Sequence, residues 1–208
     1  MRRAALIAAC VTACACSQPA APPASAGAAA APPQAAAAGA TSGKIAGRVN
    51  AAGTAVVVLE PKTVRTFGAP GEKPVMDQAG LMFGPELLLV RTGYPVEFRN
   101  SDDTLHNVRV SHEETRTSAF NVAIPTGEAY TYTFERDGFY RVGCDIHPAM
   151  AASVFASASP FTAVAGGDGS FTFDDVPAGA WTVTVYTGGK RLQHDVDVAG
   201  GVTNVTIE

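Results

Sequence analysis

The stretch that decides the fold is residues 127–150, GEAYTYTFERDGFYRVGCDIHPAM. Aromatic residues and threonines alternate from Tyr130 to Phe134, which is the period-two pattern of a half-buried strand. A turn over residues 136–138 follows, and a second apolar segment then leads into Cys144. Two strands joined by a tight turn therefore run into a cysteine, a histidine and a methionine that fall within seven consecutive residues.

The same pattern extends along most of the chain. Turns rich in glycine, proline and aspartate separate short runs that are either apolar or alternating, and no stretch of ten or more residues has a convincing helical period. Many short strands with such turns are typical of β-sandwiches, so we predict an all-β chain. The runs are residues 56–59, 87–90, 96–99, 108–110, 171–173, 183–186 and 196–198.

The first residues have the features of a bacterial leader. In residues 1–16, two arginines precede a short apolar run that ends in a small-residue segment, as in a secretory signal. The sequence Val-Thr-Ala-Cys ending at Cys14 resembles a lipoprotein processing box, with Cys16 and then Cys10 as alternatives and an unlipidated secreted protein as the other reading. Residues 17–43 contain 13 alanines, five prolines and no charge, and are predicted to be a disordered tether. We expect the protein in the periplasm or cell envelope, held to a membrane by the lipid anchor only.

Charge and hydropathy exclude two classes of protein. All 19 acidic residues but only 13 of the 15 basic ones follow residue 43, so this part carries a net charge of −6 and has no cluster of lysine or arginine. Such a body is unsuited to bind nucleic acid. No apolar run approaches the roughly 20 residues of a membrane-spanning helix. An acidic body favours a partner with a basic patch, such as a small cytochrome.

One set of side chains indicates a metal site. Cys144 is the single cysteine after the leader; His147 and Met150 follow it at intervals of three, and His106 lies 38 residues upstream. Each of these residues alone fits an ordinary core or polar position. Together, two imidazoles, one thiolate and one thioether are the ligands of a mononuclear blue-copper centre. Structural zinc prefers four strong ligands, and haem attachment needs Cys-x-x-Cys-His. We therefore predict one copper ion.

The remaining histidines bear on whether the chain is an enzyme. His112 and His194 have polar neighbours and are predicted to be surface residues. A copper enzyme needs an additional site of several histidines, which four histidines in total do not supply, so we predict no enzymatic activity. His147 and the following Pro148 lie in the middle of the ligand loop and are the expected port for electrons.

Residues 82–155 resemble a cupredoxin, and the loop from Cys144 to Met150 resembles that of the amicyanins. The pattern around Pro85-Glu86-Leu87, Val96-Glu97-Phe98-Arg99-Asn100 and His106-Asn107-Val108 also follows this family. The resemblance implies a Greek-key β-sandwich that carries electrons for a redox partner such as a cytochrome or a dehydrogenase. It further implies that Asn107 ties the two ligand loops together and holds the thiolate.

A second resemblance covers both ends of the chain after the tether. Residues 168–183 resemble the turns and strand of a carboxypeptidase regulatory-like, or transthyretin-like, β-sandwich, and residues 43–59 resemble its first two strands. Trp181 is expected in its core. The sandwich has no catalytic constellation, so we interpret it as a scaffold or docking surface.

The two resemblances together predict a discontinuous arrangement. Residues 44–62 and 160–208 would form the small sandwich, with the cupredoxin of residues 63–159 inserted between its second and third strands. The alternative is two consecutive domains, with residues 44–60 supplying the first cupredoxin strands. The strand partner of residues 55–59 distinguishes the two arrangements.

Three functions remain. The first is a type 1 copper electron carrier; the second is a lipoprotein that stores or delivers copper without a redox circuit. The third is an adhesion or carbohydrate-binding lipoprotein with a vestigial ligand set.

Overall fold

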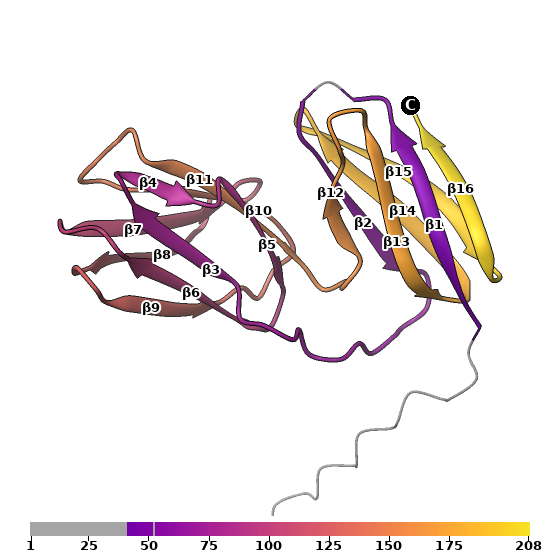
Figure 1. Cartoon of the computed structure of the whole chain (residues 1–208), viewed down its shortest axis with the longest axis horizontal. Helices are drawn as coiled ribbons and strands as arrows, with labels where there is room; N and C mark the ends of the chain where they lie inside the picture. The colour runs from indigo at the N-terminus through magenta and orange to yellow at the C-terminus, as the bar shows by residue number, and fades with distance from the viewer. Residues whose placement is uncertain (1–40, 52) are drawn as a thin grey trace, which may run out of the picture. The chain divides into compact units, whose positions relative to one another are not determined.

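The computed structural model describes residues 41–51 and 53–208, which form sixteen strands and no helix (Figure 1). The all-β prediction is thereby confirmed. The expected leader, its three cysteines and nearly all of the expected tether lie outside the described residues. Within the described part, no helix is long and apolar enough to cross a bilayer.

The middle of the chain forms what we call the central sandwich, made of strands β3 to β11 in two sheets (Figure 1). The larger sheet has the strand order β5-β11-β10-β7-β8, and the smaller has the order β4-β3-β6-β9. Its strands are β3 (Val75–Ala79), β4 (Met82–Gly84), β5 (Leu87–Arg91), β6 (Pro95–Asn100), β7 (His106–His112), β8 (Ser118–Ile124), β9 (Ala129–Thr133), β10 (Gly138–Gly143) and β11 (Ala151–Ser157).

The strands on either side of this segment form the flanking sandwich. One sheet has the order β13-β1-β16 and the other has the order β12-β2-β14-β15. Its strands are β1 (Ser42–Val49), β2 (Ala55–Pro61), β12 (Thr162–Val164), β13 (Ser170–Pro177), β14 (Gly179–Thr187), β15 (Lys190–Val198) and β16 (Gly201–Ile207).

Strand β2 shows which sheet the early residues join. It pairs antiparallel with β14, with Leu59 opposite Val183, and its other edge pairs with β12. Strand β1 pairs with β13 and, in parallel, with β16. Residues 42–61 thus complete sheets built from the C-terminal strands, which is the pairing that insertion of the central sandwich requires.

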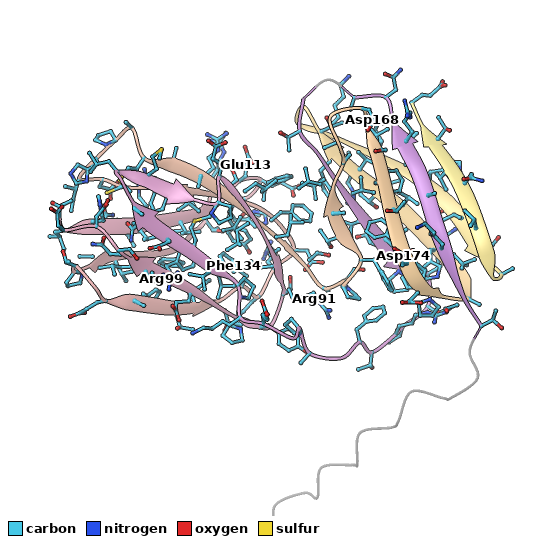
Figure 2. All side chains as sticks on the ribbon, in the orientation of Figure 1. Arg91, Arg99, Glu113, Phe134, Asp168 and Asp174 are labelled. Atoms are coloured by element: carbon cyan, nitrogen blue, oxygen red, sulfur yellow. The ribbon has the colours of Figure 1, made fainter. Side chains whose placement is uncertain are left out.

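Each sandwich has its own apolar core. In the central one, the ring of Phe98 is fully buried, with its centroid 5.2 Å from that of Phe120 and 6.4 Å from that of Phe134 (labelled in Figure 2). In the flanking one, Trp181 is fully buried as expected, and its indole N–H donates to the Pro177 carbonyl oxygen at 2.9 Å. Burial of these rings supplies a large share of the apolar area that holds each sandwich together.

Candidate metal centre

Two neighbouring strands bring the predicted ligands together. Strands β7 and β10 pair antiparallel, with Arg109 opposite Gly143, so the start of β7 lies beside the end of β10. His106 is the first residue of β7, and Cys144 directly follows β10. The segment between β10 and β11 carries the other two predicted ligands, and its backbone is closed by a bond from the Met150 N–H to the His147 carbonyl oxygen at 2.9 Å.

Three donor atoms face one another at this point. The Sγ of Cys144 lies 3.9 Å from the Nδ1 of His106 and 3.9 Å from the Nδ1 of His147, and the two Nδ1 atoms are 2.9 Å apart. The point equidistant from all three atoms is about 2.1 Å from each, close to the bond length from imidazole nitrogen to a first-row metal such as zinc, about 2.0–2.1 Å. The separations therefore fit a single metal ion of this size.

Met150 is buried close to Cys144, whose backbone N–H donates to the Met150 carbonyl oxygen at 3.4 Å. The side chain of Met150 is 2% exposed and belongs to the same core cluster as that of Cys144, which is 3% exposed. A thioether is a soft, weak donor, which is the property that the predicted role of Met150 requires. The donor set of two nitrogens and two sulfurs suits copper better than the hard cations, which prefer oxygen ligands.

A carboxylate fixes the tautomer of His106. The Nε2 of this fully buried ring lies 2.8 Å from Oδ2 of Asp102. Because an ionised carboxylate only accepts hydrogen bonds, the ring proton lies on Nε2 and the lone pair on Nδ1 faces Cys144. This is the arrangement that a metal-ligating histidine requires.

Asp102 is itself held by the turn between β3 and β4. Gly80 and Leu81 both adopt positive φ, 63° and 58°, and their N–H groups donate to the Asp102 carboxylate at 2.5 and 3.0 Å. The bond from Leu81, then those from His106 and Gly80, hold the pKa of Asp102 below its ordinary value. The turn thus keeps the carboxylate ionised opposite the histidine.

Asn107 lies between the two ligand segments. Its side chain is 7% exposed, and its Oδ1 accepts the backbone N–H of Asp145 at 2.6 Å and that of Ile146 at 3.3 Å. The thiol of Cys144 is 3.4 Å from the same oxygen. Asn107 is therefore placed where it can join β7 to the loop that carries Cys144 and His147.

Asp145, between two predicted ligands, has its own partners. Its Oδ1 accepts a bond from Arg109 Nε at 2.6 Å, and its Oδ2 accepts one from Asn121 Nδ2 at 3.0 Å. Arg109, followed by Asn121, lowers the pKa of the Asp145 carboxyl. The loop is therefore anchored to β7 and β8 through a side chain as well as through its backbone.

The two histidines differ in exposure. His106 is fully buried, whereas His147 is half-buried and is followed by the exposed Pro148. Four large apolar side chains near the site are exposed, and we call them the apolar rim: Leu81 (53%), Met82 (66%), Leu105 (48%) and Ile146 (47%). Leu105 directly precedes His106, and Ile146 directly precedes His147. Leu81 belongs to the turn that holds Asp102, and Met82 is the residue after that turn.

The prediction that His112 lies at the surface is wrong, whereas His194 is exposed as expected. His112 is 4% exposed; its Nε2 lies 3.1 Å from the Asp137 carbonyl oxygen, and the Thr115 N–H donates to its Nδ1 at 3.2 Å. Room for the ring comes from Gly138, where an added Cβ would lie 3.0 Å from Nε2. Both ring nitrogens are occupied within the protein fold, away from the candidate centre.

Comparison with known proteins agrees with this geometry. Residues 72–156 match the sequence model of the copper binding proteins of the plastocyanin/azurin family. This segment is a cupredoxin domain. The resemblance predicted for residues 82–155 is thereby confirmed, while the carboxypeptidase regulatory-like resemblance of the flanking sandwich stays a prediction.

Several solved structures are similar to part of the chain, whereas no curated protein matches. Amicyanin from Paracoccus versutus is 21% identical over 43% of this chain and 85% of its own, with a TM-score of 0.38. A purple cupredoxin from Nitrosopumilus maritimus is 22% identical over 41% of this chain and 100% of its own, with a TM-score of 0.36. A Cu-containing nitrite reductase from Thermus scotoductus is 26% identical over 47% of this chain but 25% of its own, with a TM-score of 0.38.

Sequence reasoning missed the residues that support the ligands of the cupredoxin domain. It did not identify Asp102, Arg109, Asn121 or Asp145. The one available signal was the position of Asp102, four residues before His106, in an acidic turn.

Proposed function

We propose that the chain is an extracytoplasmic type 1 copper protein that binds one copper ion and passes single electrons between redox partners, without transforming a substrate. The observation that carries this proposal is the convergence of Cys144 Sγ and the Nδ1 atoms of His106 and His147 within 3.9 Å of one another. The buried Met150 supplies the weak fourth donor in the proposal. Copper held by such ligands alternates between Cu(I) and Cu(II).

Hydrogen bonds from neighbouring side chains hold two of the proposed ligand segments in place. Asp102 keeps the proton of His106 on Nε2, and Asn107 holds the backbone next to Cys144. Ligands that are already in place need little rearrangement when the charge of the site changes, which favours fast electron exchange. The core around Cys144 and Met150 keeps water away from the two sulfurs.

His147 and Pro148 are the proposed port for electrons, with the apolar rim as the docking surface. His147 is more exposed than the other three proposed ligands. Exposed apolar side chains clustered on a surface commonly mark a site of protein contact. The proposed partner is a cytochrome or a dehydrogenase. Met82→Ser should slow electron exchange without changing the reduction potential; Val202→Ser, at a 61% exposed residue of the flanking sandwich, is the control.

Visible and paramagnetic-resonance spectra of the copper-loaded protein test the centre. The wild type should show the intense absorption of a copper–thiolate bond, and Cys144→Ala should abolish it. His194→Ala, at an exposed histidine of β15, is the matched control and should leave the spectrum intact. A blue Cys144→Ala protein would contradict the ligand assignment.

The same preparations distinguish electron transfer from the alternative of copper storage or delivery. A reversible reduction with rapid electron self-exchange supports the carrier. Copper that passes readily to a chaperone, without rapid electron exchange, supports delivery.

The proposal places the protein in the periplasm or cell envelope, anchored through a lipid on Cys14. Labelling with a fatty-acid analogue should mark the wild type and leave Cys14→Ser unmarked. In this proposal the flanking sandwich is a carboxypeptidase regulatory-like scaffold or docking surface, with Trp181 in its core.

A further inference from the structure

Asp145 is bound into a closed ring of hydrogen bonds. Its backbone N–H donates to Asn107 Oδ1 at 2.6 Å, and Asn107 Nδ2 donates to Asn121 Oδ1 at 2.7 Å. Asn121 Nδ2 then donates to Oδ2 of Asp145 at 3.0 Å, so the ring begins and ends at the same residue. Asn107 Nδ2 also lies 3.3 Å from that Oδ2.

Every bond in the ring has a fixed direction. A backbone N–H can only donate, which assigns Oδ1 and Nδ2 of Asn107, and this in turn assigns those of Asn121. At residue 145, a carboxylate is then the only group of this size that can accept a hydrogen bond at both of its terminal atoms. An asparagine there would place an NH₂ group against a donor in either orientation.

Arg109 provides a second attachment, on the other carboxylate oxygen. Its Nε donates to Oδ1 of Asp145 at 2.6 Å, and its guanidinium lies along Gly143, where an added Cβ would be 3.4 Å from Nη2. The guanidinium therefore lies beside the residue that directly precedes Cys144. A positive and a negative charge therefore lie in contact at the residue that directly follows Cys144.

We propose that Asp145 and Arg109 form a charged latch that positions the ligand loop and balances the charge next to the metal centre. The first half of this proposal, the positioning half, says that the pair holds the ligand loop in place, and it stands on the hydrogen bonds alone. The second half, the balancing half, says that the pair balances charge next to the metal, and it rests on the proposed function. Removing the carboxylate charge should favour Cu(I) and raise the reduction potential. Removing the guanidinium charge should favour Cu(II) and lower it, and removing both should largely cancel.

The size of the positioning effect follows from exposure. The side chains of Arg109 and Asp145 are 51% and 48% exposed, so solvent screens their attraction. Exposed ion pairs contribute modestly, which corresponds to about a two- to fivefold change in the population of the open loop. That range is measurable by hydrogen exchange.

The test uses Arg109→Gln, Asp145→Asn and the double variant of the full chain. Arg141→Gln is the matched control, because Arg141 Nη2 forms a comparable exposed pair with Glu113 at 2.8 Å (Glu113 is labelled in Figure 2). Amide exchange in metal-free protein measures the loop at residues 145 and 146, whose N–H groups bond to Asn107. Voltammetry of the copper-loaded proteins measures the potential.

In the expected result, Arg109→Gln speeds exchange at residues 145 and 146 about two- to fivefold and Arg141→Gln does not. Single variants shift the potential in opposite directions, and the double variant returns toward wild type. Unchanged exchange in Arg109→Gln overturns the positioning half. Potential shifts of the same sign, or no larger than that of Arg141→Gln, overturn the balancing half. A wild type without copper–thiolate absorption refutes the proposed function and the balancing half with it, while exchange in the metal-free protein still decides the positioning half.

Discussion

Replacing Asn107 with alanine should lower the free energy of unfolding of the metal-free protein by about 1–4 kcal/mol. The side chain is 7% exposed, and its Oδ1 accepts the Asp145 N–H at 2.6 Å. Leaving this partly buried donor without its partner costs about 1–3 kcal/mol. The bond from Nδ2 to the exposed Asn121 adds less than about 1 kcal/mol, because water can replace it there.

Urea unfolding of metal-free protein, followed by circular dichroism, measures this loss. Asn121→Ala is the matched control, since it removes one amide of the same ring from an exposed position, and it should cost less than about 1 kcal/mol. Equal losses in the two variants, or a loss below about 0.5 kcal/mol in Asn107→Ala, would show that Asn107 does not join the ligand segments as its contacts suggest.

Three further predictions concern Met150 as the weak fourth donor, the dependence of stability on low pH, and the core of the central sandwich. Met150→Leu should keep copper bound but raise the reduction potential, because losing a weak donor destabilises Cu(II) more than Cu(I); an unchanged potential in voltammetry would mean that Met150 is not a ligand. Hydrogen bonds from Ser170, with the charge of Arg48, hold the pKa of Asp168 below its ordinary value of 3.8. The stabilisation that ionised Asp168 gives is complete above about pH 4 and disappears as the pH falls through its folded-state pKa. Urea midpoints should therefore show Asp168→Asn to be less stable than wild type at neutral pH, with a smaller difference between the two at about pH 2. A difference that does not change with pH contradicts this. Phe98→Ala, at a fully buried ring, should cost about 3–5 kcal/mol in urea unfolding, and a cost below about 2 kcal/mol would mean that the core refills the cavity.

Sequence patterns identified strands where side chains alternate clearly. The residues of β9 alternate aromatic and threonine side chains, and β6 alternates apolar and polar ones. Strands β8, β11 and β16 were not predicted, because alanine, serine, asparagine and glycine interrupt the alternation. Their place in the sheets depends on pairing with strands remote in sequence, such as β1 with β16.

The ligand positions could be read from spacing, but the residues that hold them could not. Asp102 meets a turn 21 residues upstream, and Asp145 meets Arg109 from 36 residues away, so both roles depend on the folded arrangement. His112 was misread for a different reason. Adjacent residues of a strand face opposite sides of the sheet, so the polar neighbours Ser111 and Glu113 gave no information about its own side.

The arrangement of the donors also affects the order in which the protein is assembled. Cys144, His147 and Met150 fall within one short peptide, whereas His106 joins them only when β7 and β10 pair. A newly made or unfolded chain therefore already offers two sulfurs and an imidazole to any soft metal it encounters. Affinity for the unfolded chain subtracts from the stabilisation that a metal gives the native state. Loading after folding should thus yield uniform protein, while early exposure to free metal traps chains that lack the distant imidazole.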